Sequence, residues 1–152
     1  MEFTIRPIAF VHNTRTEAID DNWGPIESEI RLEESLPVEC FEGIEGFSHL
    51  EVVFVFDKAV GITPVLGKGH PRENPAWPEV GIYAQRKRLR PNFIGCTHVR
   101  LLRHEGRSLF VERLDAIDGT PVVDIKPVVR EFLPHGEVVQ PWWVDTLMKE
   151  YW

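Results

Sequence analysis

Cysteine is scarce in this sequence, and long apolar runs are absent from it. The chain of 152 residues contains two cysteines, Cys40 and Cys96, which are too few for a disulfide scaffold or a cysteine-rich zinc site. A membrane-spanning helix needs about 20 apolar residues in succession, and no run approaches that length. Residues 1–6 are more typical of a strand than of a cleavable leader. We therefore expect a cytoplasmic protein with no membrane segment.

Several common catalytic and nucleotide-binding motifs are also missing. Gly67-Lys68 is preceded by Gly61, which is one residue too far away for a phosphate loop, and Gly69 stands where Ser or Thr would bind magnesium. The same glycines lack the third member of a dinucleotide fingerprint. The six histidines do not pair at zinc-binding spacing, and no Gly-x-Ser-x-Gly elbow is present. We therefore expect neither a Rossmann fold nor a metal site.

Positive charge is in the minority, but it is concentrated in one place. The formal net charge is -7, whereas proteins that bind nucleic acids are usually basic because they neutralise phosphates. Arg86, Lys87, Arg88 and Arg90 nevertheless lie within one short stretch that contains no acid. Such a run is either a solvated face or a surface that binds anions.

The pattern of apolar residues predicts an all-β protein. Twelve prolines and 11 glycines are scattered along the chain, which is typical of many short elements joined by turns. Residues 104–107 predict a hairpin turn, and 59–78 predict a long loop. We expect a single domain, 1–152, formed by a β-barrel of about seven strands with a short C-terminal helix in a tail from about residue 128. The predicted strands are 3–11, 28–32, 50–56, 80–84, 94–103, 108–114 and 121–125, and the predicted helix is 142–152.

Three segments are specific in combination, although each alone is a weak signal. They read GFSHL (46–50) followed by VFVF (53–56), VGIYAQR (80–86) followed by RPNFIG (90–95), and LDAIDGTPVVDIKP (114–127). In their order and approximate spacing they resemble the TsaA-like family, also called the TrmO-like family. The resemblance extends from Ile5 to about Pro127.

This resemblance implies both a fold and a function. It implies a compact β-barrel, a homodimer, and S-adenosylmethionine bound near the subunit interface. In members of known activity, the reaction methylates the exocyclic amine of threonylcarbamoyladenosine beside the tRNA anticodon. An anticodon loop is single-stranded, so a base can leave it without opening a duplex. Longer members have an additional C-terminal domain, and we expect this chain to be close to the barrel alone.

Two departures from the family pattern lie in the stretch that the resemblance assigns to the cofactor. Phe93 replaces a proline that is common after Arg-Pro-Asn. Gln85 and Lys87-Arg88 replace the Thr and the Ser-Pro found around the arginine in many relatives. These departures concern fine specificity more than cofactor binding.

Candidate cofactor residues follow from the resemblance and from side-chain chemistry. Arg86 carries a fork of donors that suits a carboxylate or a phosphate. Trp23 is expected either to stack on a purine or to plug the barrel mouth. Cys96, two positions before His98 on one strand face, also fits a half-buried structural thiol. The candidates are Asn22, Trp23, Gly24, Asp57, Lys58, Arg86, Cys96, Leu114 and Asp115.

Two acids are candidates for catalysis. An exocyclic amine has a weak lone pair and must lose a proton, so a carboxylate within reach of it would help. Asp115 and Asp118 flank a turn at a strand end, where side chains can face a cleft. For Asp118, a residue that precedes Gly119, the alternative is an ordinary turn role in which it accepts hydrogen bonds from its own backbone.

The expected RNA-binding residues are Lys87, Arg88, Arg90 and Asn92, which together offer charge and hydrogen bonds to phosphates. Two alternatives to a tRNA methyltransferase stay open. One is a sensor or adaptor that binds S-adenosylmethionine without catalysis. The other is a methyltransferase that acts on a small molecule.

Overall fold

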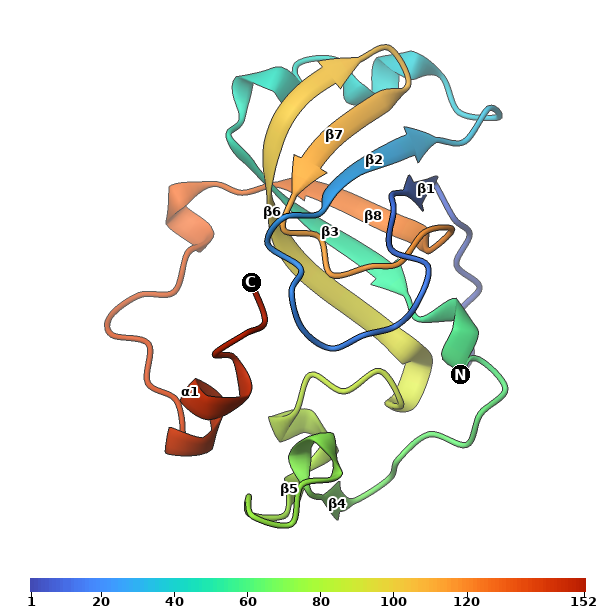
Figure 1. Ribbon diagram of the computed structural model, residues 1–152. Helices are drawn as coiled ribbons and strands as arrows, with labels where there is room; N and C mark the ends of the chain where they lie inside the picture. Colours follow the sequence, from blue (N-terminus) through green and yellow to red (C-terminus); the bar gives the residue numbers. More distant parts are fainter.

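The computed structural model describes residues 1–152, and six antiparallel strands form a closed barrel at its centre (Figure 1). Each strand pairs with its neighbours around the barrel, and β8 closes the sheet by pairing with β1. The predicted β-barrel is therefore confirmed. In spatial order the strands are β1 (Ala9–His12), β2 (Glu27–Leu32), β7 (Ser108–Glu112), β6 (Ile94–Glu105), β3 (His49–Val55) and β8 (Pro121–Pro127).

Alternation along the strands forms the core. In β3, Leu50, Val52 and Phe54 point inward and are almost fully buried, while the residues between them are half-buried. The predicted strand 50–56 is thus present as β3. A barrel gives each strand one inner face, so Val53 and Val55 lie on the outside.

The predicted hairpin at 104–107 is present between β6 and β7. Glu105 pairs with Ser108, and Gly106 has a φ of 57°, a left-handed conformation that glycine adopts without steric cost. The predicted first strand is shorter than expected, because only Ala9–His12 finds partners on β2 and β8. Phe3 and Ile5 are exposed and unpaired in any sheet.

The predicted strand 80–84 does not join the barrel. Only β5 (Val80–Gly81) is extended, and it pairs with β4 (Lys68–Gly69) in a separate small sheet. Short 3-10 helices account for much of the remaining order outside the strands. They are Val38–Phe41, Ile44–Gly46, Asp57–Ala59, Pro71–Glu73, Ile82–Ala84, Pro91–Phe93 and Arg130–Phe132.

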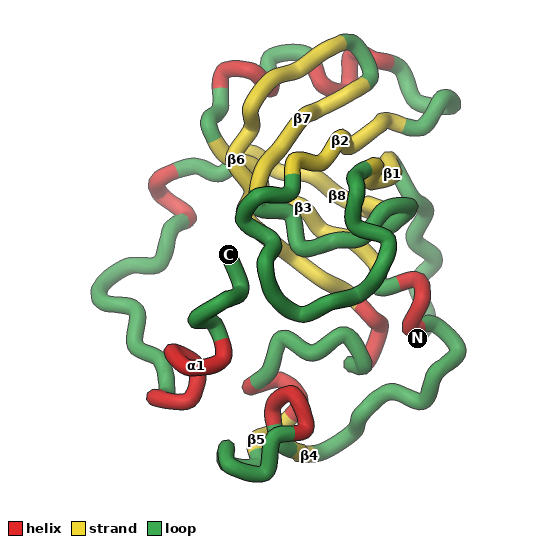
Figure 2. Tube along the Cα trace, viewed as in Figure 1, coloured by secondary structure: helices red, strands yellow, loops and turns green.

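Residues 56–93, the excursion between β3 and β6, lie outside the barrel, as does the C-terminal tail. Figure 2 shows that both are mainly loop. The helix α1 (Trp142–Leu147) is shorter than the predicted 142–152. Its Trp143 is buried beside Trp77 of the excursion, with ring centroids 6.4 Å apart. No helix has the length and apolar character that crossing a membrane requires. The chain after α1 returns to the barrel, as its terminus in Figure 1 shows.

Candidate active site

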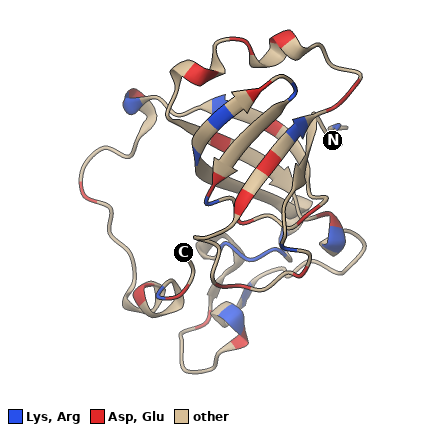
Figure 3. Cartoon of the chain, turned by 45° about the horizontal axis from the view of Figure 1, so that its top comes forward, with Lys and Arg blue, Asp and Glu red and all other residues tan.

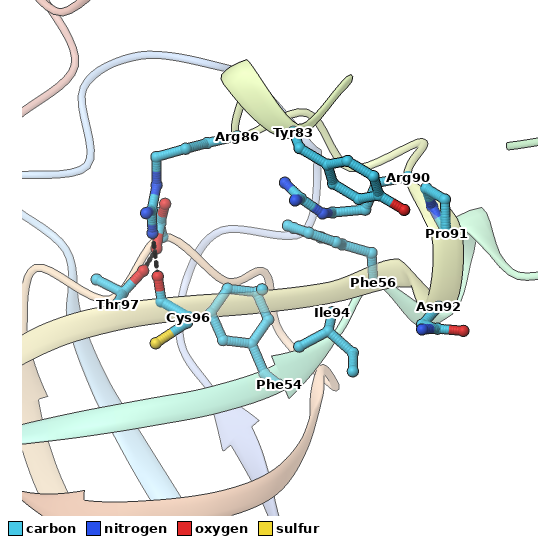
Figure 4. Close-up of a pocket in the computed structure, with 12 residues that line it drawn as sticks. Phe54, Phe56, Tyr83, Arg86, Arg90, Pro91, Asn92, Ile94, Cys96 and Thr97 are labelled. Carbon is cyan, nitrogen blue, oxygen red and sulfur yellow. Dashed lines mark hydrogen bonds between the residues drawn. The ribbon is translucent and has the colours of Figure 1, made fainter. Parts of the chain in front are cut away.

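A pocket of about 330 Å³ opens where β3 and β6 meet the excursion loop (Figure 4). This volume lies in the range of small-molecule sites, which is about 300–1,000 Å³. In Figure 4, Tyr83, Arg86 and Arg90 of the loop lie across from Phe54 and Ile94 on the strands and from Phe56, which follows β3. The full lining is Phe54, Phe56, Tyr83, Arg86, Arg90, Pro91, Asn92, Ile94, Gly95, Cys96, Thr97 and Asp115.

A missing side chain shapes the floor of this pocket. Gly95 lies opposite Phe54 in the pairing of β3 with β6. A Cβ at Gly95 would lie 2.4 Å from Cε2 of Phe54, so only glycine lets the ring cross the strand here. The ring of Phe56 packs edge-on against Phe54, with centroids 5.3 Å apart. Glycine in the second motif therefore makes an aromatic floor possible.

The loop enters β6 through a tight turn at Asn92 and Phe93. Their φ values are 66° and 54°, which are uncommon for residues with side chains. The Phe93 amide donates to the Arg90 carbonyl at 3.1 Å, and its carbonyl accepts from the Phe56 amide at 2.8 Å. A proline at 93 could neither adopt this φ nor donate that hydrogen bond. The departure at Phe93 thus coincides with a backbone that proline cannot form.

Two guanidinium groups provide the positive charge of the pocket. Arg86 donates from Nη2 to the carbonyl of Cys96, and Arg90 donates from Nη1 to the carbonyl of Gln85 at 2.9 Å. Neither group forms an ion pair, whereas the neighbouring Lys87 lies 3.6 Å from a carboxylate oxygen of Glu73. The charges of Arg86 and Arg90 therefore stay available to an anionic ligand.

One carboxylate, that of Asp115, provides the negative charge. Its Oδ1 accepts a hydrogen bond from Thr97 Oγ1, and its Oδ2 accepts one from the phenol of Tyr151. Burial is the main cause that raises the pKa of Tyr151 above its usual range, and the negative charge of Asp115 raises it further. The phenol therefore keeps its proton and acts as a donor. Burial also raises the pKa of the Cys96 thiol, so this group is mainly protonated at neutral pH.

Sequence reasoning placed several residues on this site, and the structure brings five of them together. Arg86, Cys96 and Asp115, assigned to the cofactor, line the same pocket as Arg90 and Asn92, assigned to RNA. Arg86 and Asp115 come from separate motifs on opposite sides of β6 and β7 in the chain. Phe54 and Phe56 belong to the first specific segment, so the pocket joins all three.

The predicted group Asn22, Trp23 and Gly24 lies beside the tail and does not line the pocket. Trp23 is buried, with the Arg15 guanidinium 4.5 Å from its ring centroid. Its amide donates to the carbonyl of Tyr151 at 2.8 Å. This placement favours the plug role of Trp23 over stacking on a ligand.

Other candidates also lie outside the pocket lining. Asp57 and Lys58 pair with each other at 3.1 Å in the 3-10 helix after β3. Leu114 is fully buried in the barrel core and does not line the pocket. Asp118 Oδ1 accepts a hydrogen bond from the backbone amide of Asn13 at 3.1 Å, so it binds a distant segment of the chain and not its own turn.

The two remaining basic candidates lie on the loop next to the pocket. Arg88 is exposed and Lys87 is half-buried, and neither lines the cavity. In Figure 3 basic and acidic residues are mixed over the barrel, and a basic stretch of loop runs below it. Nowhere do three or more His, Cys, Asp or Glu side chains gather in a way that could hold a metal ion.

Sequence reasoning missed Thr97, Tyr83 and Tyr151. Thr97 had a signal, because alternation puts it on the inner face of β6 with Gly95 and Val99, where a polar side chain near a strand end marks a pocket. Tyr83 stood inside the second motif, but only its exposure at the cavity shows its position. Tyr151 fitted a helix face, and no local pattern indicated its contact with Asp115.

Comparisons with known proteins identify relatives of this chain. The family described as the tRNA-methyltransferase O N-terminal domain matches residues 20–132. The human tRNA (adenine(37)-N6)-methyltransferase is 36% identical over 105 residues, which are 69% of this chain and 23% of that protein. A probable S-adenosyl-L-methionine-binding protein of Methanothermobacter thermautotrophicus is 34% identical over 132 residues, covering 84% of this chain and 90% of the relative.

Solved structures show the same fold. A crystal structure of TrmO from Pseudomonas aeruginosa superposes with a TM-score of 0.74 at 26% identity, over 94% of this chain and 62% of that one. A putative S-adenosylmethionine-dependent methyltransferase of the same species, RcsF, is 38% identical over 102 residues, 67% of this chain and 42% of the relative. The chain thus spans between about a fifth and two fifths of the mammalian and Pseudomonas relatives.

Proposed function

This chain belongs to the tRNA-methyltransferase O N-terminal domain family, and on that premise we propose that it methylates the N6 amine of threonylcarbamoyladenosine next to the tRNA anticodon, with S-adenosylmethionine as donor. The observation that carries the proposal is the pocket, which combines unpaired guanidinium groups, a carboxylate and aromatic rings. The names of relatives that bind S-adenosylmethionine or methylate tRNA support it.

The donor set fits S-adenosylmethionine, which supplies a methyl group on a positively charged sulfur. Arg86 suits its carboxylate, because a guanidinium group binds a carboxylate through paired donors. Asp115 offers a negative charge to the sulfonium. Phe54, Phe56 and Tyr83 offer ring faces to the adenine.

In this proposal Asp115 has two roles. Its charge stabilises the bound sulfonium, and since that charge disperses in the transition state, the effect falls on binding more than on rate. Its oxygens each accept one hydrogen bond within the protein, and a carboxylate has lone pairs to accept more. We assign proton acceptance from the amine to Asp115, and a structural role to Asp118, which accepts a hydrogen bond from the Asn13 amide.

The basic loop next to the pocket is the proposed tRNA contact. It contains Arg90 and Asn92, which line the cavity, and Lys87 and Arg88, which lie next to it. These side chains can hold phosphates that flank the target base. Such contacts position the RNA, and the single-stranded anticodon loop lets the adenosine enter the pocket. A few local contacts suffice for this, so an acidic net charge does not oppose it.

The same proposal includes a homodimer in the cytoplasm. Exposed apolar side chains of the tail, among them Phe132, Val139 and Trp142, are candidates for the subunit contact. Size-exclusion chromatography with light scattering measures the mass directly.

Methyl transfer to tRNA tests the function. Purified protein, labelled S-adenosylmethionine and tRNA that carries threonylcarbamoyladenosine should yield label in that nucleoside, identified by mass spectrometry. Unmodified tRNA is the matched substrate control, and Asp115→Asn is the matched enzyme control. If S-adenosylmethionine binds but no label reaches the modified tRNA, the protein is not this enzyme, and the sensor alternative stands.

A further inference from the structure

The end of the C-terminal tail, residues 142–152, lies outside residues 20–132 of the family match. It returns to the pocket and is held there by its backbone. The amide of Asn22 donates to the carbonyl of Glu150, and that of Trp23 donates to the carbonyl of Tyr151, both at 2.8 Å. Gly24 lies so close to Trp152 that a Cβ would be 2.6 Å from its carbonyl carbon. The position of the Tyr151 backbone is therefore fixed by the loop 22–24.

The Tyr151 side chain then reaches the wall of the pocket. Its ring packs edge-on against Trp152 at 5.0 Å between centroids, and its phenol donates to Asp115 Oδ2. Thr97 holds the other oxygen of the same carboxylate. Because burial raises the pKa of Tyr151, the phenol stays protonated and cannot replace Asp115 as the anion. Two donors thus fix the rotamer of one pocket carboxylate.

We propose that Tyr151 is a positioning residue of the methyltransferase site: its hydroxyl holds the Asp115 carboxylate toward the pocket, so that a segment far from the family motifs completes the site. The proposal rests on the proposed function, since it gives Tyr151 a role only through Asp115. Tyr151 itself does not line the cavity and touches no reacting atom. A supporting contact of this kind is needed to keep a charged group within a fraction of an ångström of its working position.

The test uses variants that separate the hydroxyl from the ring. Tyr151→Phe removes the donor and keeps the packing against Trp152. Since Asp115 binds the sulfonium of the donor, this variant should raise the KM and the dissociation constant for S-adenosylmethionine about five- to tenfold, the size of one net hydrogen bond. Its kcat should also fall, because the same carboxylate accepts the proton of the amine. Thr97→Val should behave in the same way, and Thr97→Ser, which keeps a hydroxyl, should restore affinity.

A double-mutant cycle with Asp115→Asn shows whether Tyr151 acts through that carboxylate. If it does, adding Tyr151→Phe to Asp115→Asn should cause little further loss of affinity. Additive losses would overturn the positioning role. So would a Tyr151→Phe variant with wild-type KM and kcat beside a defective Tyr151→Ala, because the ring, and not the hydroxyl, would then matter. Wild-type protein that binds no S-adenosylmethionine would instead overturn the proposed function itself.

Discussion

A methyl group added at Gly95 should disturb both the core and the pocket. In Gly95→Ala the new Cβ would lie 2.4 Å from Cε2 and 2.5 Å from Cζ of Phe54, whereas carbon atoms in contact are about 3.5–4.0 Å apart. Phe54 is 1% exposed and is packed against Phe56, so its ring cannot move without displacing core atoms. Overpacking of this kind costs about 1–3 kcal/mol. For a domain of this size we expect Tm to fall by about 2–12 °C.

Thermal unfolding followed by circular dichroism measures this effect, and calorimetry measures the affinity for S-adenosylmethionine. The displaced ring forms part of the pocket lining, so affinity should fall together with Tm. Gly46→Ala is the matched control, since no atom lies within 4 Å of its Cβ and its φ is not positive. This control should leave Tm unchanged or slightly raised. A Gly95→Ala protein with wild-type Tm and affinity would refute the packing argument.

Three further predictions concern charge and reactivity. Arg86→Ala should weaken S-adenosylmethionine binding about tenfold or more, and Arg86→Lys should recover only part of the loss because an ammonium lacks the fork of donors; calorimetry that finds equal affinities would exclude the carboxylate contact. Burial raises the pKa of Cys96, so at pH 8 this residue has less thiolate than a free thiol. Iodoacetamide should therefore alkylate the exposed Cys40 first, and the rate of Cys96 alkylation should rise only at higher pH. Peptide mass spectrometry that finds Cys96 modified first would contradict this. Arg72→Ala removes two hydrogen bonds to Asp21, at 2.7 and 3.0 Å, and should lower the free energy of unfolding by about 1–2 kcal/mol; an unchanged urea midpoint would show that the pair is only a surface contact.

The barrel could be predicted because its strands carry local signals. Alternation in 28–32 and the turn around Gly106 specify strand and hairpin from neighbouring residues alone. The strand limits were less predictable, since they depend on partners. Residues 3–7 are β-rich yet join no strand, and only Val80–Gly81 of the segment 80–84 finds a strand partner, in β4.

The site was predictable to the extent that motifs marked it. Arg86 and Asp115 stand in two specific segments, and both line the pocket. The contact of Tyr151 with Asp115 joins residues far apart in the chain, and it depends on how the loop 22–24 holds the tail. A contact of this kind has no local sequence pattern, because packing and not periodicity determines it.

Chemical-shift mapping by NMR during a titration with S-adenosylmethionine tests the central claim most directly. If the cofactor occupies the pocket, the amides of Gly95, Cys96, Thr97 and Asp115 should shift in a saturable way, while that of Gly106 at the far hairpin should not. Shifts that cluster away from these pocket residues, or no shifts at millimolar cofactor, would contradict the account.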